Sequence, residues 1–352
     1  MKPDTIAWAD HLLEQRELAL ALSLFNHAEE EGADPDRCAA GRWMIFMLSG
    51  DFAAAWRESD GIRLRCIPDV HRFWHGEDLQ GKCVMLRCLH GFGDSIQMLR
   101  FIPALKGLGV VRVIVECSPN AVGLVKCMRG IDEVITWGLE APRIPPAFDV
   151  QMEVMELPYV LRATLSTLPA VGLLQLPREV LQKAGRAIEA ISATPQVGIV
   201  WSAGDWNPSR SISLDLLRPI LRNSRLHFWN LQGGRVREDW HGLPTSPHLH
   251  DAIEFTDAGL VPLAALMANL DLVITVDTLA AHLAGALGIS CFLLLQYAAD
   301  WRWMTDRTDS PWYPSLRLFR QPRHEDWQGA VSDMNNALAA WAKTASSRRT
   351  AA

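Results

Sequence analysis

The chain has 352 residues, 49% of them hydrophobic, which is enough for two sizeable cores and a smaller module. Its formal net charge of −6, with no long basic run, argues against a nucleic-acid partner held through phosphate contacts. No stretch approaches the roughly 20 uninterrupted apolar residues that span a bilayer, so we expect no transmembrane segment and no signal peptide. The seven cysteines are odd in number and form no CxxC pair, which favours reduced thiols in a cytoplasmic protein over disulfides or a zinc site.

Residues 1–75 are expected to form a short all-helical module. Residues 16–22 and 50–56 align at an offset of 34, with Ala19 matched by Ala53. This period, with small residues between bulky ones, is typical of tetratricopeptide repeats, in which alanines allow paired helices to pack closely. Two units are fewer than such arrays usually need for stability, so we expect the module to dock on the domain that follows. Two unrelated helical hairpins are the alternative.

Strands and helices alternate from about residue 80. Strands are expected at 82–89, 110–116, 132–137 and 148–155. This alternation predicts a doubly wound, parallel α/β half over residues 76–180. Residues 165–195 are weakly patterned and end in a polar helix from about Arg178, so we interpret them as a bridge between two halves.

A second alternating set occupies residues 193–325. Strands are expected at 196–201, 227–231, 272–276 and 291–295, with helices at 214–222, 260–268 and 278–287. Two such halves in tandem predict two Rossmann-like domains that face each other across a cleft. Apolar residues spaced by four and three from Trp327 to Trp341 predict a closing helix over residues 326–344 that crosses back toward the first half.

The loop after the first strand of the first half contains Gly91, Gly93 and Asp94. The glycines permit a tight turn and the close approach of a ligand to the backbone. Asp94 is expected at the mouth of the cleft, where it could accept a proton from a hydroxyl nucleophile, or it only caps the following helix. Gly91-x-Gly93 with Glu116 partly imitates a dinucleotide fingerprint, but the third glycine is absent, which argues against an NAD-dependent oxidoreductase.

The most informative stretch is residues 271–288, where a buried strand runs into a helix that Gly288 ends. Ligands bind at the carboxyl ends of strands in open α/β sheets, and a helix N-terminus offers unpaired N–H groups to a phosphate. Asp277, Thr278 and His282 therefore lie where a nucleotide diphosphate and its sugar could be held. An ordinary strand–helix unit with Asp277 as the N-cap is the alternative.

Two further loops of the second half carry candidate ligands. The loop at 202–213 contains Ser202 and Arg210, and this arginine could fork two hydrogen bonds to phosphate oxygens. A solvated surface arginine is the alternative. The loop at 296–314 is rich in aromatic residues with interleaved charges. Its rings could cover a base or sugar, but we prefer the interpretation that they pin a long loop to the core.

Four stretches together resemble one bacterial family: residues 91–109, 201–214, 276–288 and 300–321. They are similar to tetratricopeptide-repeat proteins whose C-terminal region is like glycosyltransferase family 9, the heptosyltransferases. The resemblance implies the α/β class and a GT-B fold of two Rossmann-like domains, preceded by the short tetratricopeptide-like helical module. It places the acceptor mainly on the first domain and the nucleotide sugar on the second.

The resemblance also implies an inverting transfer that needs no metal and no cofactor, with a nucleotide-diphosphate sugar as the donor substrate. By position, Asp94 matches the proposed catalytic base of the heptosyltransferases. Arg210 falls where they place a lysine that meets the donor phosphates. Their donor-binding residues are matched here by Asp277, Thr278 and His282.

Three functions are compatible with these residues. The first is glycosyl transfer to a glycan or protein acceptor of unknown identity. The second is a non-catalytic interaction module that binds a protein partner through the helical repeats, and the third is a GT-B nucleotide-sugar epimerase. The presence of Asp94, Arg210, Asp277 and His282 favours the transferase. Leu279 replaces a glycine typical of the heptosyltransferases, which argues against heptose as the sugar.

Overall fold

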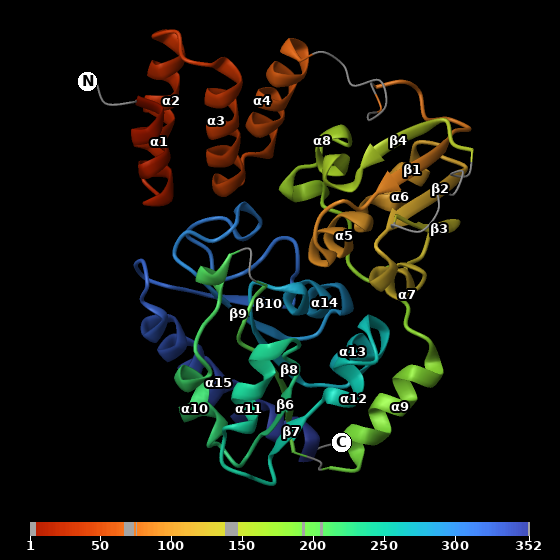
Figure 1. Ribbon diagram of the computed structural model, residues 1–352, viewed down its shortest axis with the longest axis vertical. Helices are drawn as coiled ribbons and strands as arrows, with labels where there is room; N and C mark the ends of the chain where they lie inside the picture. Colours follow the sequence, from red (N-terminus) through yellow and green to blue (C-terminus); the bar gives the residue numbers. More distant parts are fainter. Residues whose placement is uncertain are drawn as a thin grey trace.

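The computed structural model describes residues 5–66, 74, 76–137, 147–191, 194–204 and 207–350, with side chains up to residue 345 (Figure 1). The expected domain limits at residues 75 and 193 lie outside the described residues. A helical module, a first α/β half and a second α/β half follow one another along the chain. The seven cysteines form no disulfide. Within the described residues, no helix is both long and apolar enough to cross a membrane.

Residues 5–65 form four helices: α1 (Thr5–Glu14), α2 (Leu18–Glu30), α3 (Pro35–Ser49) and α4 (Phe52–Arg65). The Asp34 side chain caps α3 and the Asp51 side chain caps α4, each accepting a hydrogen bond from a backbone N–H of the first turn. A Cβ atom on Gly41 would lie 2.3 Å from the Phe25 ring, so glycine allows α3 to pack closely on α2. The helical module is therefore present, and its assignment to the tetratricopeptide repeats stays a prediction.

The first half contains a parallel sheet that, over the described residues, has four strands in the order β3-β2-β1-β4. Apolar runs place these strands close to their expected positions. The strands are β1 (Cys83–Arg87), β2 (Arg112–Cys117), β3 (Glu133–Thr136) and β4 (Val150–Glu153), and the accompanying helices are α5 (Phe92–Met98), α6 (Ile102–Gly107), α7 (Val122–Val125) and α8 (Leu157–Val160). The expected polar bridge helix is α9 (Arg178–Glu189).

The second half contains a parallel sheet whose described strands follow the order β10-β9-β8-β5-β6-β7. Two strands that were not expected from the sequence, β7 and β10, form its edges. The strands are β5 (Gln196–Val200), β6 (His227–Asn230), β7 (Leu249–Asp251), β8 (Leu272–Val276), β9 (Cys291–Leu295) and β10 (Leu316–Arg320), with helices α10 (Leu214–Leu221), α11 (Glu238–His241), α12 (Ile253–Thr256), α13 (Leu260–Met267) and α14 (Leu279–Leu287).

The last helix, α15 (Trp327–Thr350), packs on the second half. Its buried Val331, Met334 and Leu338 share a core cluster with Ile274 and Phe319 of the second sheet. The expected helix is therefore present, but the expectation that it crosses back toward the first half is wrong. The apolar side chains of this helix pack on the second sheet instead.

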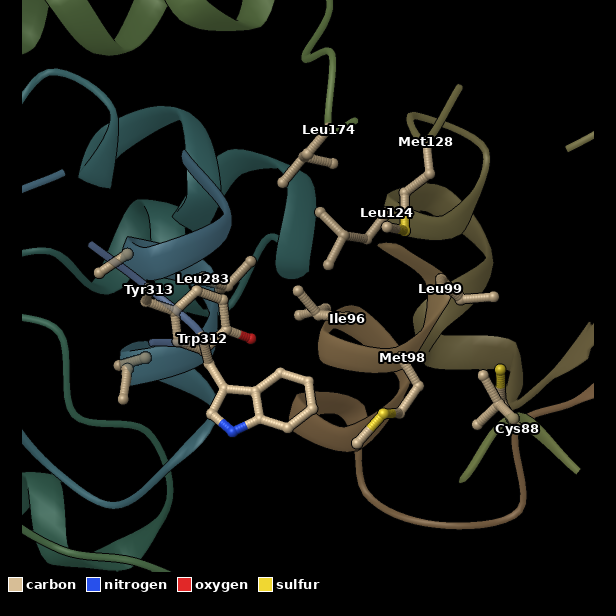
Figure 2. Close-up of a cluster of buried hydrophobic side chains, with 14 of the residues drawn as sticks. Cys88, Ile96, Met98, Leu99, Leu124, Met128, Leu174, Leu283, Trp312 and Tyr313 are labelled. Carbon is tan, nitrogen blue, oxygen red and sulfur yellow. The ribbon is translucent and has the colours of Figure 1, made fainter. Parts of the chain in front are cut away.

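One continuous apolar core joins the helical module to both halves. Figure 2 shows Ile96 and Leu124 of the first half in the same cluster as Leu283 and Trp312 of the second. Phe52 of the module also belongs to this cluster, with its ring centroid 5.9 Å from that of Trp312. Because the module and both halves contribute buried residues to it, apolar side chains of the two halves pack directly against one another.

Candidate active site

The carboxyl ends of β5 and β8 bring two of the expected donor ligands together. Arg210 is half-buried and its Nη1 donates a hydrogen bond to the backbone oxygen of Asp277 at 3.0 Å. The Oγ of Ser202 lies 3.3 Å from that of Ser211 in the same loop as Arg210. Parallel strands end at one edge of the sheet, so loops distant in sequence converge there.

A cavity of about 910 Å³ opens at this edge. Arg210 and Asp277 line it, and their neighbours in its wall are mostly polar residues of the loops that follow β5 and β9: Asn207, Ser209, Ser211, Gln296, Tyr297 and Asp300. The volume lies within the range of about 300–1,000 Å³ that is usual for ligand pockets. The cavity is therefore large enough for a nucleotide sugar.

Asp277 is a buried carboxylate in the wall of this cavity, with 7% of its surface exposed. Burial and the repulsion of nearby Asp300 raise its pKa to about 6, although Arg210 and Arg302 act in the opposite direction. Asp277 does not cap the following helix. Thr278 caps α14 instead, since its Oγ1 accepts a hydrogen bond from the Ala280 N–H at 3.2 Å.

His282 lies one turn into α14, where it faces the first half. Its ring is 5% exposed, and its Nδ1 lies 3.0 Å from the hydroxyl of Tyr313. A Cβ atom on Gly93 of α5 would lie 2.5 Å from the His282 ring. Burial, with a smaller contribution from the charge of Arg302, lowers the pKa of His282 to about 3, so the ring is neutral near pH 7. The structure thus places His282 in the contact between the halves, and its expected contact with the donor stays a prediction.

Asp94 both caps α5 and forms an ion pair across the two halves. Its Oδ2 accepts a hydrogen bond from the Gly91 N–H at 3.0 Å, and its Oδ1 accepts one from Arg302 Nη2 at 2.6 Å. Arg302 Nη1 also contacts Asp300 Oδ1 at 2.8 Å, and its Nε donates to Gln97 Oε1 at 2.8 Å. The Asp94 side chain is 28% exposed, whereas Arg302 is only 10% exposed. Asp94 is not among the described residues that line the cavity.

The aromatic loop between β9 and β10 serves mainly to pin the chain to the core. Trp301, Trp303, Trp312 and Tyr313 are at most 8% exposed. This agrees with the interpretation preferred from the sequence. Tyr297 is the exception, because it is only half-buried; it lines the cavity, as Trp301 also does, and donates its hydroxyl hydrogen to the backbone oxygen of Gln15 at 3.0 Å.

Arg302 was not predicted from the sequence as a member of the site. Only the alternation of charges with tryptophans in this loop was evident. The signal that was present is Asp300, whose side chain caps the short 3₁₀ turn Trp301–Trp303 by accepting from the Arg302 N–H at 3.0 Å. That cap aims the guanidinium toward Asp94, but no local pattern identifies the partner.

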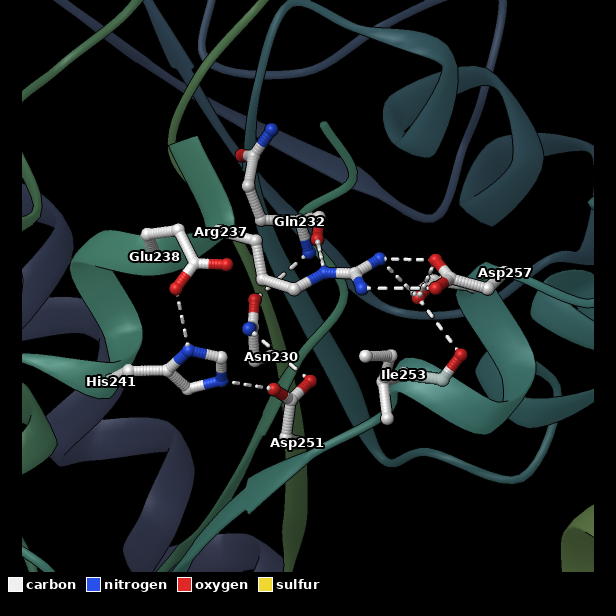
Figure 3. A network of polar contacts seen from close by, with 9 residues as sticks. Asn230, Gln232, Arg237, Glu238, His241, Asp251, Ile253 and Asp257 are labelled. Atoms are coloured by element: carbon white, nitrogen blue, oxygen red, sulfur yellow. Dashed lines mark hydrogen bonds and ion pairs between the residues drawn. The ribbon is translucent and has the colours of Figure 1, made fainter. Parts of the chain in front are cut away.

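The Ser202 loop contacts Gln232, which belongs to the polar network of Arg237 and Asp257 in Figure 3. Gln232 Oε1 accepts hydrogen bonds from the backbone N–H groups of Trp201 and Ser202 at 3.1 and 2.9 Å. Arg237 donates from Nε to the Gln232 backbone oxygen at 3.2 Å and forms an ion pair with Asp257. These contacts fix the backbone at Trp201 and Ser202, where the loop that carries Arg210 begins.

Nothing in the described part of the chain resembles a metal centre, since no three His, Cys, Asp or Glu side chains gather closely enough to hold an ion.

The chain has a GT-B fold with an N-terminal helical module. This class is defined by two Rossmann-like halves with parallel sheets and by charged side chains at the strand ends of the second half.

Comparison with known proteins agrees with this fold class. No protein-family model matches the chain. The chain is 25% identical over 356 aligned positions to Protein FlbA of Caulobacter vibrioides, covering 93% of this chain and 59% of that protein. It thus spans about three fifths of the length of this relative.

Solved structures of similar fold are glycosyltransferases. The glycosyl transferase family 9 protein from Veillonella parvula has a TM-score of 0.55 and 12% identity, with 75% of this chain and 98% of that chain covered. The ADP-heptose lipopolysaccharide heptosyltransferase II of E. coli has a TM-score of 0.54 and 13% identity, with 73% and 98% covered. At such low identity the likeness establishes the GT-B fold, and the activity has to be argued from the site.

Proposed function

We propose that the protein is a glycosyltransferase that moves a sugar from a nucleotide-diphosphate donor to a hydroxyl acceptor, with inversion at the anomeric carbon. The observation that carries this proposal is the cavity of about 910 Å³ at the strand ends of the second half, with Arg210 and Asp277 in its wall. The similar structures include enzymes named for ADP-heptose, so ADP-sugars are among the first donors to test. The expected cytoplasmic location is part of the same proposal.

The donor diphosphate would lie against the N-terminus of α14. The first N–H groups of that nine-residue helix and the guanidinium of Arg210 supply positive charge without a metal ion. Asp277 would accept hydrogen bonds from hydroxyl groups of the donor. When the bond between the sugar and the diphosphate breaks, Arg210 would stabilise the negative charge that collects on the leaving diphosphate.

Asp94 is the proposed base. It would take the proton of the acceptor hydroxyl as the hydroxyl oxygen forms its bond to the anomeric carbon, on the face opposite the departing diphosphate. A carboxylate has about four lone-pair sites, so the bonds from Gly91 and Arg302 leave Asp94 able to accept another. Arg302 is then a positioning residue, because it acts through Asp94.

Donor binding is tested by calorimetry with ADP, GDP, UDP and dTDP and one sugar nucleotide of each. Removing a charge-assisted phosphate contact costs about 1.5–3 kcal/mol, so Arg210→Ala should bind the diphosphates about tenfold or more weakly. Asp277→Ala should weaken the sugar nucleotide more than the free diphosphate. Arg218→Ala is the matched control, since Arg218 forms an exposed ion pair with Asp215 on α10 and does not line the cavity. Unchanged affinity in both site variants would place the donor elsewhere.

A second candidate is a protein that binds a nucleotide sugar without transferring it, as a regulator or an epimerase would. Two observations favour it. Apolar side chains of the two halves pack directly against one another, and Asp94 is outside the set of described residues that line the cavity. Nucleotide binding without turnover toward any hydroxyl acceptor would support this candidate.

A further inference from the structure

The cavity at the strand ends has a second wall, formed by the helical module. The module contributes Asp10, Leu13 and Glu14 from α1, Arg16 from the loop after it, and Arg37 and Met44 from α3. This wall faces the residues of the second half that carry the proposed diphosphate site. The cavity is therefore completed by a segment that the GT-B halves do not contain.

The module is held firmly in this position. Arg16, whose φ of 62° lies in the left-handed region, donates from Nη2 to the backbone oxygen of Ala299. On the far side of the same loop, the Thr305 N–H donates to the Leu48 backbone oxygen at 3.0 Å. Because the loop between these contacts also supplies Asp300, the wall and the site form one unit.

The two walls differ in chemistry. On the second half, the rings of Tyr297 and His324 lie 4.6 Å apart at the cavity and could stack on a nucleobase. On the module, the described lining residues include no ring. There, Arg37 Nη2 donates to both carboxylate oxygens of Asp10, and these side chains remain 42% and 37% exposed. Charged groups of both signs suit the hydroxyl groups of a sugar better than they suit a base.

We propose that Asp10, Glu14 and Arg37 of the helical module are specificity-determining residues that bind the hydroxyl groups of the donor's sugar. This inference rests on the proposed function. The donor is favoured over the acceptor as the occupant because Arg210 and Asp277 line the cavity, whereas Asp94 is absent from its described lining. The module is thereby part of the donor site as well as a support for the fold.

The test compares the free nucleoside diphosphate with its sugar nucleotide in calorimetry, using ADP and ADP-heptose, GDP and GDP-mannose, and UDP and UDP-glucose on the full chain. Arg37→Ala and Glu14→Gln should each weaken binding of the sugar nucleotide by about fivefold or more. Binding of the matching diphosphate should change by less than about twofold. The control is Arg65→Ala, which breaks the exposed Arg65–Asp36 pair (2.7 Å) of the same module, neither member of which lines the cavity, and should change neither affinity.

The outcomes separate the inference from the function on which it rests. If Arg210→Ala weakens both ligands while Arg37→Ala and Glu14→Gln weaken neither, the inference is wrong and the donor site stands. If the module variants weaken the free diphosphate as strongly as the sugar nucleotide, the wall contacts the nucleoside and the sugar assignment is overturned. If the unmodified protein binds none of the three pairs, nor dTDP and its sugar nucleotide, the proposed function falls and the inference falls with it.

Discussion

The buried carboxylate of Asp277, at the proposed ligand site, lowers the stability of the folded protein when it is ionised. Its pKa is about 6 in the folded protein, above the ordinary carboxyl value of 3.8, because the group is buried near Asp300. Between these two values the folded chain binds more protons than the unfolded chain. Stability contributed by protonated Asp277 is therefore complete below about pH 4 and is lost as the pH rises through about 6.

Replacing Asp277 by Asn should stabilise the protein near neutral pH, because the amide carries no buried charge. The shift from 3.8 to about 6 corresponds to a gain of up to about 3 kcal/mol in the free energy of unfolding at pH 7.5. The gain should shrink toward zero at about pH 4, while nucleotide-sugar binding weakens. Urea unfolding at both pH values measures the difference. A gap that stays constant or widens as the pH falls would contradict the burial argument.

Asp94 can be tested as a base separately from its role as a cap. Asp94→Asn keeps the shape of the side chain and can still accept from the Gly91 N–H, but it removes the negative charge. Turnover should fall by about 10²–10⁴-fold, with donor affinity nearly unchanged. Steady-state kinetics with the donor found by calorimetry provide the measurement. Full turnover combined with a lower melting temperature would return Asp94 to a capping and ion-pairing role.

At the scale of elements, the contact between α5 and α14 depends on a glycine. A Cβ atom at position 93 would lie 2.5 Å from the ring of His282, which is buried and cannot move freely. Gly93→Ala should therefore destabilise the protein by about 1–3 kcal/mol through overpacking, although alanine is the better helix former. Thermal and urea unfolding measure this loss.

Gly107→Ala is the matched control for this prediction. Gly107 ends α6, and a Cβ atom added there would have no described atom within 4 Å beyond its own helix and chain neighbours. The control should be neutral or slightly stabilising. Equal effects of the two substitutions would mean that helix propensity, and not the contact with His282, determines the result.

Elements with a strong local pattern were predictable from the sequence. The run from Leu272 to Val276 and the left-handed Gly288 that ends α14 both lie where expected. The three-residue edge strand β7 was missed, because so short a segment has no readable alternation. The ion pair of Asp94 with Arg302 joins residues 208 positions apart, so only the packing of the two halves could reveal it.

At the scale of the whole molecule, the shared core predicts cooperative unfolding. Trp56 of the module donates from Nε1 to the Ala163 backbone oxygen at 2.7 Å, and Phe52 packs on Trp312 of the second half. Since the module and both halves bury surface against one another, they should unfold in a single transition. Far-UV circular dichroism and tryptophan fluorescence in urea should give coincident curves. A helical module that melts first would contradict this prediction.

The tandem repetition of strands and helices was sufficient to predict the two halves, and the small residues of the first 65 positions were sufficient to predict paired helices. The position of the cavity was not predictable. The sequence suggested a cleft between the halves, where apolar residues such as Ile96 and Leu283 pack against one another. The cavity described above lies between the second half and residues such as Leu13 and Arg37, which only the docking of the module brings there.

The apolar contact between the halves also bears on the timing of substrate exchange. Hinged opening of two domains takes microseconds to milliseconds, and in many enzymes it limits turnover. A hinge here would have to split a packed interior on every cycle. We therefore expect the donor to enter, and the spent nucleotide to leave, past the rim of the helical module by movements of side chains and loops. Such movements are faster than domain opening, so the chemical step would set the pace of the cycle.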